Sequence, residues 1–221
     1  MRAEDFLVAP CNRVAHALLA RWPEGQDPVL VLTGPPGSGK THLARIWAER
    51  RSALWLEAAG LAEPPAAWAE AASWVVDDGE RCSDETFLFH LVNLARAEGR
   101  GLVLTSAFPV AVWRPRLPDL RSRLLAAPTV AIDPIDDALL AAVLVKQLAD
   151  RQLRVGPQVV HYLVARMERS FVAARRLVGL LDALALERRR PITTALARDA
   201  LQRLGHALHD HHEREETTPW T

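Results

Sequence analysis

Cysteine is scarce in this chain, and long apolar runs are missing. The two cysteines, Cys11 and Cys82, stand far apart and show no C-x-x-C spacing. This argues against a disulfide scaffold and favours a reducing compartment. The N-terminus is charged, and no apolar run follows it that is long enough for a signal peptide or a membrane span. We therefore expect a cytoplasmic protein without a membrane partner.

An excess of either charge is also lacking. The chain has 27 basic and 27 acidic residues, which give a formal net charge of zero. No overall field therefore attracts nucleic acid or an anionic membrane. Lysine occurs only as Lys40 and Lys146. Hydrophobic residues make up 49 % of the 221 residues, which is ordinary for a globular chain with a full core.

One of these two lysines closes a glycine-rich stretch of the form G-x-x-x-x-G-K-[ST]. The stretch consists of Gly34, Pro35, Pro36, Gly37, Ser38, Gly39, Lys40 and Thr41. A β-prone run, 29–32, precedes it, and apolar residues at helical spacing follow it. In this arrangement backbone N–H groups surround a phosphate chain, the lysine reaches the β- and γ-phosphates, and the Thr41 hydroxyl binds Mg²⁺. The sequence therefore predicts a nucleotide site here.

Two carboxylates end another apolar run. Asp77 and Asp78 follow the predicted strand that begins at Trp74. Downstream of a phosphate-binding loop, we expect Asp77 to hold Mg²⁺ and Asp78 to polarise the attacking water, with Glu80 as a weaker stand-in for Asp78. The alternative is a strand that ends in an ordinary polar turn.

Hydroxyl side chains close the fourth predicted strand. Thr105 and Ser106 stand where a polar group can hydrogen-bond the γ-phosphate or its water, and Ser106 is our candidate for a catalytic role. A hydroxyl that satisfies nearby backbone groups is an equally open alternative.

Strands and helices alternate up to residue 134, and only helices follow. The predicted strands are 29–32, 53–57, 74–78, 102–105 and 129–132, and this alternation predicts a parallel α/β sheet. We expect a nucleotide-binding domain over 1–134, a helical lid over 135–205 and a polar, disordered tail over 206–221. The predicted helix N-caps are Asn12, Ser83, Asp136, Ser170 and Thr193.

Together these motifs resemble the AAA+ ATPases of the DnaA branch, most closely the Hda group of DnaA-related replication regulators, over residues 5–204. The resemblance rests on the lead-in at 5–12, the glycine stretch continued by His42 and Leu43, and the Asp77-Asp78 strand end. It extends through 102–106, the element LPDLRSR at 117–123, and 168–171. LPDLRSR and the lead-in are its most specific parts.

The resemblance implies a P-loop fold with a five-stranded parallel sheet, a C-terminal all-α lid, and bound ATP or ADP with Mg²⁺. It places Pro10 and Asn12 at the wall of the adenine pocket and His42 beside the phosphate loop. It also implies that Arg123 is an arginine finger for ATP on another protein, although by spacing alone this arginine is typical of a solvated basic face. The family's lid arginine would fall near Val172 or Ala173, neither of which is basic. Arg175 or Arg176 could substitute only if the helix is rotated or shifted, and Arg175 is our candidate.

The resemblance names DnaA as the expected partner and the DNA sliding clamp as a further candidate, although no clamp-binding peptide precedes the lead-in. Sequence-specific DNA binding is not expected, because the 59–73 link is too short for extra DNA-gripping helices and no helix-turn-helix follows. Self-association stays open.

The family's acidic residue after the Thr-Ser pair is Ala107 here, so we expect weak or partner-dependent hydrolysis. The main alternative is a self-sufficient AAA+ ATPase or loader. A small-molecule kinase fits less well, because the helical bundle is C-terminal and a second carboxylate follows Asp77.

Overall fold

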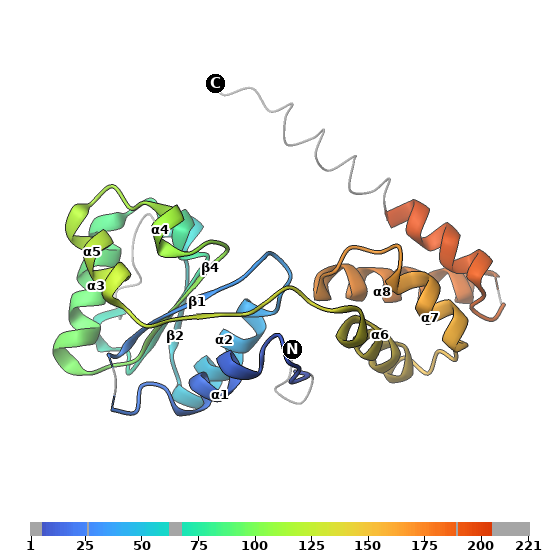
Figure 1. The fold of residues 1–221 in the computed structure, drawn as a ribbon, viewed down its shortest axis with the longest axis horizontal. Coiled ribbons are helices and arrows are strands. Elements are labelled where there is room, and N and C mark those ends of the chain that lie inside the picture. Colours follow the sequence, from blue (N-terminus) through green and yellow to red (C-terminus); the bar gives the residue numbers. More distant parts are fainter. Residues whose placement is uncertain (1–5, 26, 62–67, 189, 205–221) are drawn as a thin grey trace, which may run out of the picture. The chain divides into compact units, whose positions relative to one another are not determined.

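A computed structural model describes residues 6–25, 27–61, 68–188 and 190–204 of the chain (Figure 1). The chain divides after Pro134 into two compact units. The tail predicted over 206–221 lies outside the described residues. Within the described ranges, no helix is both long enough and apolar enough to cross a membrane.

The first unit is built on a five-stranded sheet with the order β2-β3-β4-β1-β5, in which every neighbouring pair is parallel. The strands are β1 (Val29–Thr33), β2 (Leu54–Glu57), β3 (Trp74–Asp77), β4 (Leu102–Ser106) and β5 (Thr129–Ala131). The predicted parallel α/β sheet is therefore confirmed. Because parallel strands share a direction, the ends of β1, β3 and β4 meet at one edge, where ligands of such sheets bind.

Helices cover both faces of this sheet (Figure 1). One face carries α1 (Arg13–Arg21) and α2 (Lys40–Arg51), and the other carries α3 (Glu85–Glu98), α4 (Val110–Trp113) and α5 (Pro118–Ala126). Leu30 and Leu32 of β1 pack toward the first pair, whereas Val29 and Val31 pack toward the second group. Strand β1 is thus apolar at successive positions because both of its faces are buried.

Short 3₁₀ turns occupy two of the connections. They are η2 (Ala58–Gly60) and η3 (Trp68–Glu70) between β2 and β3, and η4 (Gly79–Arg81) after β3. In its described residues, 59–61 and 68–73, the link between β2 and β3 has short turns and no α-helix.

The second unit consists, within its described part, of helices alone. They are α6 (Asp137–Asp150), α7 (Pro157–Val164), α8 (Phe171–Arg188) and a last helix over 194–204. Helix α6 packs against both α7 and α8 through fully buried leucines such as Leu140, Leu144 and Leu177. This arrangement buries one apolar stripe from each helix.

Four of the five predicted N-caps are confirmed, three of them by side-chain hydrogen bonds. Asp136, Ser170 and Thr193 accept backbone N–H groups three residues ahead, at 2.7, 3.0 and 3.4 Å. Ser83 was the wrong choice for α3, because the side chain of Asp84 accepts from the Phe87 N–H at 2.9 Å. Asn12 is the N-cap residue of α1, as predicted, although its side chain makes no cap hydrogen bond.

Candidate functional site

The glycine loop (residues 34–41) joins the end of β1 to the start of α2. Gly34 lies so close to its surroundings that a Cβ there would stand 2.5 Å from the carbonyl oxygen of Ile132. Gly39, the N-cap of α2, has a left-handed φ of 99°, a conformation that side chains disfavour. These glycines are therefore required by the backbone path, which leads directly to a helix N-terminus suited to anions.

Ser38 has a buried hydroxyl within this loop. The residue is 2 % exposed, and its Oγ has no hydrogen-bond partner among the described residues. Buried polar groups in native proteins almost always have a partner. The orphaned hydroxyl thus fits a loop that accommodates a polar group such as a phosphate.

The ammonium of Lys40 is held inside the glycine loop. Its Nζ donates to the carbonyl oxygens of Gly34 at 2.7 Å and Pro35 at 3.0 Å. Burial lowers the pKa of Lys40, while the negative charges of Asp78, Glu80 and Asp77 oppose this decrease. A cation enclosed by loop carbonyls and faced by carboxylates is placed where a phosphate chain would lie along the loop.

Asp77 joins three elements at the edge of the sheet. Its Oδ1 accepts from the hydroxyl of Thr41 on α2 at 3.2 Å and from that of Thr105 on β4 at 2.6 Å. Burial raises the pKa of Asp77, and the charge of Asp78 adds to this, whereas the hydrogen bonds from Thr105 and Thr41 and the charge of Arg45 lower it. We call Thr41, Asp77 and Thr105 the strand-end group.

The strand-end group offers hydroxyl and carboxylate oxygens, which are the ligands that Mg²⁺ prefers. Magnesium in such sites keeps waters and phosphate oxygens as its remaining ligands. The described residues contain no cluster of three or more His, Cys, Asp or Glu that could hold a metal alone. The residues present therefore fit a Mg²⁺ ion that is bound together with a phosphate chain. Thr41 and Asp77 would be the protein ligands of this ion.

Thr105 is the residue that sequence reasoning did not select. It is fully buried, and its hydroxyl accepts from the Asp78 N–H at 2.9 Å while it donates to Asp77. Ser106 instead donates its hydroxyl to the carbonyl of Phe108 at 2.6 Å and accepts from the same residue's N–H at 3.1 Å. Ser106 thus stabilises the turn after β4, and its catalytic role stays a prediction.

After β3 the chain enters the 3₁₀ turn η4, which Asp78 precedes and which contains Glu80. Asp78 adopts a left-handed φ of 52°, a conformation that aspartate tolerates better than most residues do. Glu80 accepts from the Ala107 N–H at 2.8 Å through Oε1, while its Oε2 is buried without a partner among the described residues. Ala107 is the residue that follows Thr105 and Ser106. The carboxylate of Glu80 therefore lies beside the backbone of that residue, whose own side chain is not acidic.

The lead-in lies against the start of α1 and the first turn of α2. Asn12, only 1 % exposed, accepts from the Ala9 N–H at 2.8 Å and donates to the Leu7 carbonyl at 2.9 Å. Phe6 stacks on His16 and meets the edge of His42, with ring centroids 5.8 and 5.4 Å apart. The structure thus brings the lead-in next to His42.

Pro10 is exposed in this folded lead-in. The neighbouring Cys11 accepts a hydrogen bond from the backbone N–H of Asp133, just beyond β5, at 2.9 Å through its carbonyl oxygen. The described part of the lead-in, residues 6–12, is therefore held through Phe6 and through Cys11. The contact of Pro10 and Asn12 with an adenine ring, and of His42 with a bound nucleotide, stays a prediction.

Two predicted arginines lie outside the glycine loop. Arg123 is on α5, and its guanidinium carbon stands 5.4 Å from the ring centroid of Phe89 on α3. Arg175 is an exposed residue of α8 in the second unit. Both assignments stay predictions.

No protein-family model matches the chain, and no curated protein sequence matches it. Solved structures do match its fold. Domain III of the replication initiation protein DnaA from Thermotoga maritima is 16 % identical and matches with a TM-score of 0.76 over 90 % of this chain and 94 % of that one. AMPPCP-bound DnaA from Aquifex aeolicus is 18 % identical, with a TM-score of 0.71 over 94 % and 69 % of the two chains.

The RuvB Holliday junction branch migration motor of Thermotoga maritima is a third such match. It is 18 % identical and gives a TM-score of 0.67 over 86 % of this chain and 67 % of that chain. Matches at this identity establish the fold alone. The chain therefore has the AAA+ P-loop fold, a parallel α/β sheet followed by C-terminal helices.

Proposed function

We propose that this chain is a DnaA-like AAA+ regulator of replication initiation that binds ATP or ADP with Mg²⁺. In this proposal it acts by protein contact, in the manner of the Hda group, and supplies Arg123 to ATP bound by a DnaA partner in the cytoplasm. The glycine loop, the enclosed Lys40 and the strand-end group support nucleotide binding. AMPPCP is bound to DnaA in two solved structures with the same fold.

The arginine-finger part depends mainly on one observation. The guanidinium of Arg123 makes no hydrogen bond or ion pair with any described residue and lies over an aromatic ring at the surface. A guanidinium without such partners is free to contact the phosphates of a partner's nucleotide.

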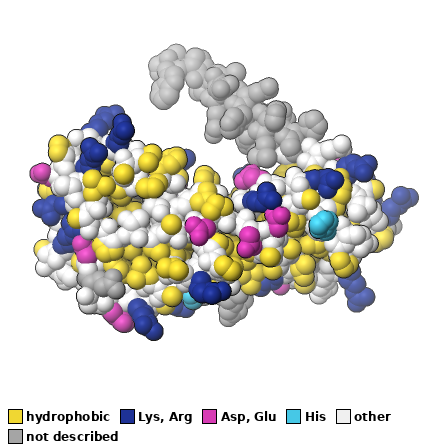
Figure 2. All heavy atoms as spheres, viewed as in Figure 1, with side chains coloured by type: hydrophobic (Ala, Val, Ile, Leu, Met, Phe, Trp, Pro, Cys, Tyr) yellow, Lys and Arg dark blue, Asp and Glu magenta, His cyan; other side chains and the backbone are white. Residues whose placement is uncertain are grey.

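The surroundings of Arg123 also suit an anionic target. Arginines at 114, 116, 121 and 123 fall in a stretch that has one acidic residue, Asp119. Figure 2 shows basic side chains gathered over this end of the first unit, where Figure 1 places α4 and α5. The chain's zero net charge therefore conceals a local basic surface, which favours contact with phosphates or an acidic partner.

The test is a reconstituted ATPase assay with ATP-loaded DnaA, with and without the DNA-loaded sliding clamp. Because an arginine supplied by another subunit is worth about 10³–10⁵ in rate, Arg123→Ala should reduce hydrolysis to the rate of DnaA alone. The control is Arg50→Ala, which changes an exposed arginine of α2 outside this basic stretch and should retain stimulation. Equal stimulation by the wild type and Arg123→Ala would reject the arginine finger.

A second function, a self-sufficient ATPase or loader, is favoured by the complete strand-end group. The chain's own ATP turnover, measured as phosphate release without a partner, should then exceed that of Lys40→Ala. If the two rates agree, the chain's nucleotide serves only as a switch in its contacts, and the regulator is the better description.

A further inference from the structure

Helix α3 contacts α5 at three points along one face. Glu85, Phe89 and Arg96 are separated by four and seven residues, which places them on the same side of a helix. Each of them contacts a different part of the segment 116–123. Helix α3 therefore contacts the start of α5, the backbone of the last turn of α5, and the side chain of Arg123.

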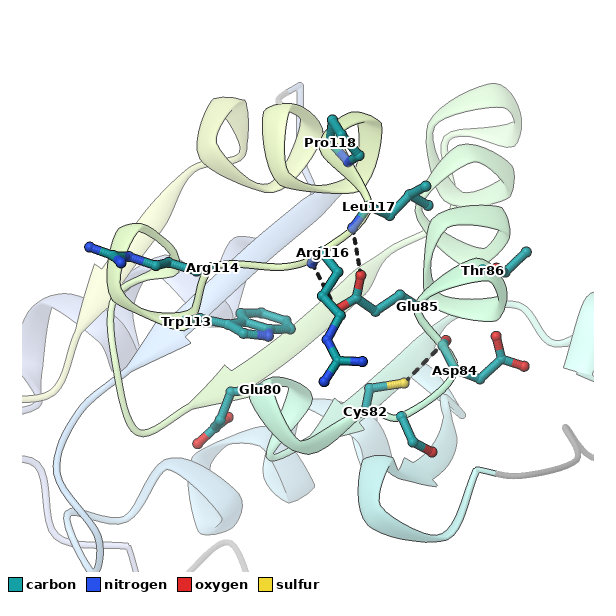
Figure 3. Close-up of a pocket in the computed structure, with 11 residues that line it drawn as sticks. Glu80, Cys82, Asp84, Glu85, Thr86, Trp113, Arg114, Arg116, Leu117 and Pro118 are labelled. Carbon is teal, nitrogen blue, oxygen red and sulfur yellow. Dashed lines mark hydrogen bonds between the residues drawn. The ribbon is translucent and has the colours of Figure 1, made fainter.

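Glu85 holds the start of α5. Its two carboxylate oxygens accept the backbone N–H groups of Arg116 at 3.0 Å and Leu117 at 2.7 Å. Figure 3 shows the carboxylate directed at these two N–H groups, at the edge of a cavity of about 660 Å³. A carboxylate that accepts two backbone N–H groups forms strong, charge-assisted hydrogen bonds, so the entry of α5 is fixed relative to α3.

Arg96 holds the backbone near the C-terminal end of α5. Its Nη2 donates to the carbonyl oxygen of Arg123 at 3.1 Å and to the carboxylate of Asp27 at 2.7 Å, and its Nε also donates to Asp27 at 3.1 Å. Because Asp27 precedes β1, Arg96 connects the backbone of Arg123 to the sheet. The backbone from which the finger extends is thus fixed at both ends.

Phe89 lies beneath the side chain itself. The ring is partly buried in the α3–α5 contact, and the Arg123 guanidinium stands over it at 5.4 Å. A cation over an aromatic face is attracted by the ring quadrupole. The ring therefore restricts a long side chain that would otherwise sample many rotamers.

We propose that Phe89 is a positioning residue for Arg123: its ring holds the guanidinium in the orientation in which it meets a partner's phosphate, while Glu85 and Arg96 fix the backbone beneath it. This inference rests on the proposed function of Arg123. Phe89 itself touches no reacting group, and its effect is to reduce the number of arginine conformers that the partner's site must select.

The experiment measures stimulated hydrolysis of ATP on DnaA against the concentration of the full chain. Phe89→Leu keeps an apolar side chain but removes the aromatic face, so the maximal stimulated rate should fall about two- to fivefold, the factor that an exposed cation–π contact carries. The concentration for half-maximal stimulation should not change, because the docking surface is intact. Phe89→Tyr keeps the ring and should restore the wild-type rate.

Two controls separate positioning from folding. Tyr162→Leu removes the cation–π pair of Arg166 in the second unit, where the distance is 4.1 Å, and should leave the stimulated rate unchanged. Glu85→Ala removes the acceptor of two backbone N–H groups and should lower the maximal stimulated rate, because the backbone beneath Arg123 is then no longer held at the start of α5. Its melting temperature shows whether the chain is still folded.

A Phe89→Leu variant as active as the wild type, beside an inactive Arg123→Ala, would overturn the positioning role and leave the proposed function standing. An equal decrease for Phe89→Leu and Phe89→Tyr would also overturn it, because the ring would then not be the cause. Full activity of Arg123→Ala would overturn both the proposed function and the inference.

The Arg123 Nε–H signal in an NMR spectrum, assigned by its loss in Arg123→Lys, tests the geometry without a partner. It should carry a ring-current shift that is lost in Phe89→Leu and retained in Phe89→Tyr. A signal that does not change in Phe89→Leu would contradict the contact itself.

Discussion

The two units of the chain bury different kinds of side chain. Among the described residues of the first unit, the buried polar residues are Asn12, Thr33, Ser38, Lys40, Ser73, Thr105 and Ser106. In the described part of the second unit the buried polar residue is Ser170, and its hydroxyl caps α8. Burying polar groups costs free energy unless they are paired. Their concentration near the strand ends therefore indicates where the chemistry lies, while the second unit is stabilised mainly by apolar packing.

The largest expected effect on stability tests the apolar side of this comparison. Leu177 of α8 is fully buried, so Leu177→Ala should lower the free energy of unfolding by about 2–5 kcal/mol through lost burial and a residual cavity. Denaturant titration followed by circular dichroism measures this. A cost below about 1 kcal/mol would show that the helical unit is loosely packed and that the contrast between the units is overstated.

The next largest effect concerns the buried polar residues of the first unit and is measured as ATP affinity. Lys40→Ala removes the charge enclosed by the glycine loop, and the affinity for ATP should fall about 10- to 100-fold, as expected for the loss of about 1.5–3 kcal/mol of charge-assisted bonding. Fluorescent-nucleotide titration gives the Kd. Lys146→Ala, the chain's other lysine, lies on α6 and is paired with Asp150 at the surface. This control should bind ATP as the wild type does.

A pH measurement sharpens the same contrast. Burial raises the pKa of Asp77 above its ordinary 3.8. As the pH rises, Asp77 loses its proton at a lower pH in the unfolded chain than in the folded chain. The free energy of unfolding therefore decreases as the pH rises from the unfolded-state pKa through the folded-state pKa. Asp77→Asn should then be more stable than the wild type at neutral pH without Mg²⁺, and this gain should vanish below about pH 4.

Chemical denaturation of Asp77→Asn and the wild type at several pH values measures this difference. A variant that is less stable at every pH would mean that the hydrogen bonds from Thr41 and Thr105 outweigh the cost of burying the charge. The variant should in either case lose Mg²⁺-dependent nucleotide binding.

The smallest effect concerns the surface pairs of the second unit. Arg151 and Asp182 approach to 3.3 Å with side chains 40 % and 44 % exposed. Such pairs contribute about 0–1 kcal/mol, so Arg151→Ala should change the free energy of unfolding only slightly, and less at high salt. A cost near that of Leu177→Ala would contradict the view that apolar packing dominates there.

Local chemistry explains which predictions succeeded. The glycine pattern, the β-branched run of β3 and the proline at the start of α5 each restrict the backbone within a few residues, so the elements could be placed from sequence. The choice between Ser83 and Asp84 as the cap of α3 could not, because both side chains suit an N-cap. In the structure α3 begins at Glu85, so Asp84 is the residue that stands at the N-cap.

The strand-end group shows a second feature that could not be predicted from the sequence. Thr105 and Ser106 are adjacent and have similar side chains, yet the alternation of a strand sends them to opposite faces. Only the pairing of β3 with β4 brings Thr105, and not Ser106, to Asp77. The role of the Asn12 side chain was missed for a related reason, since it folds the lead-in back on itself instead of making a cap hydrogen bond to α1.

The sequence by itself determined the parallel α/β sheet, the glycine loop and the carboxylates at the strand end, because residue type and spacing restrict the backbone locally. The contacts that link distant segments were decided only by the tertiary structure. Glu80 against Ala107, Thr105 against Asp77 and Phe89 beneath Arg123 each depend on how neighbouring strands or helices pack. Such pairings are set by packing over the whole sheet, and no local pattern encodes them.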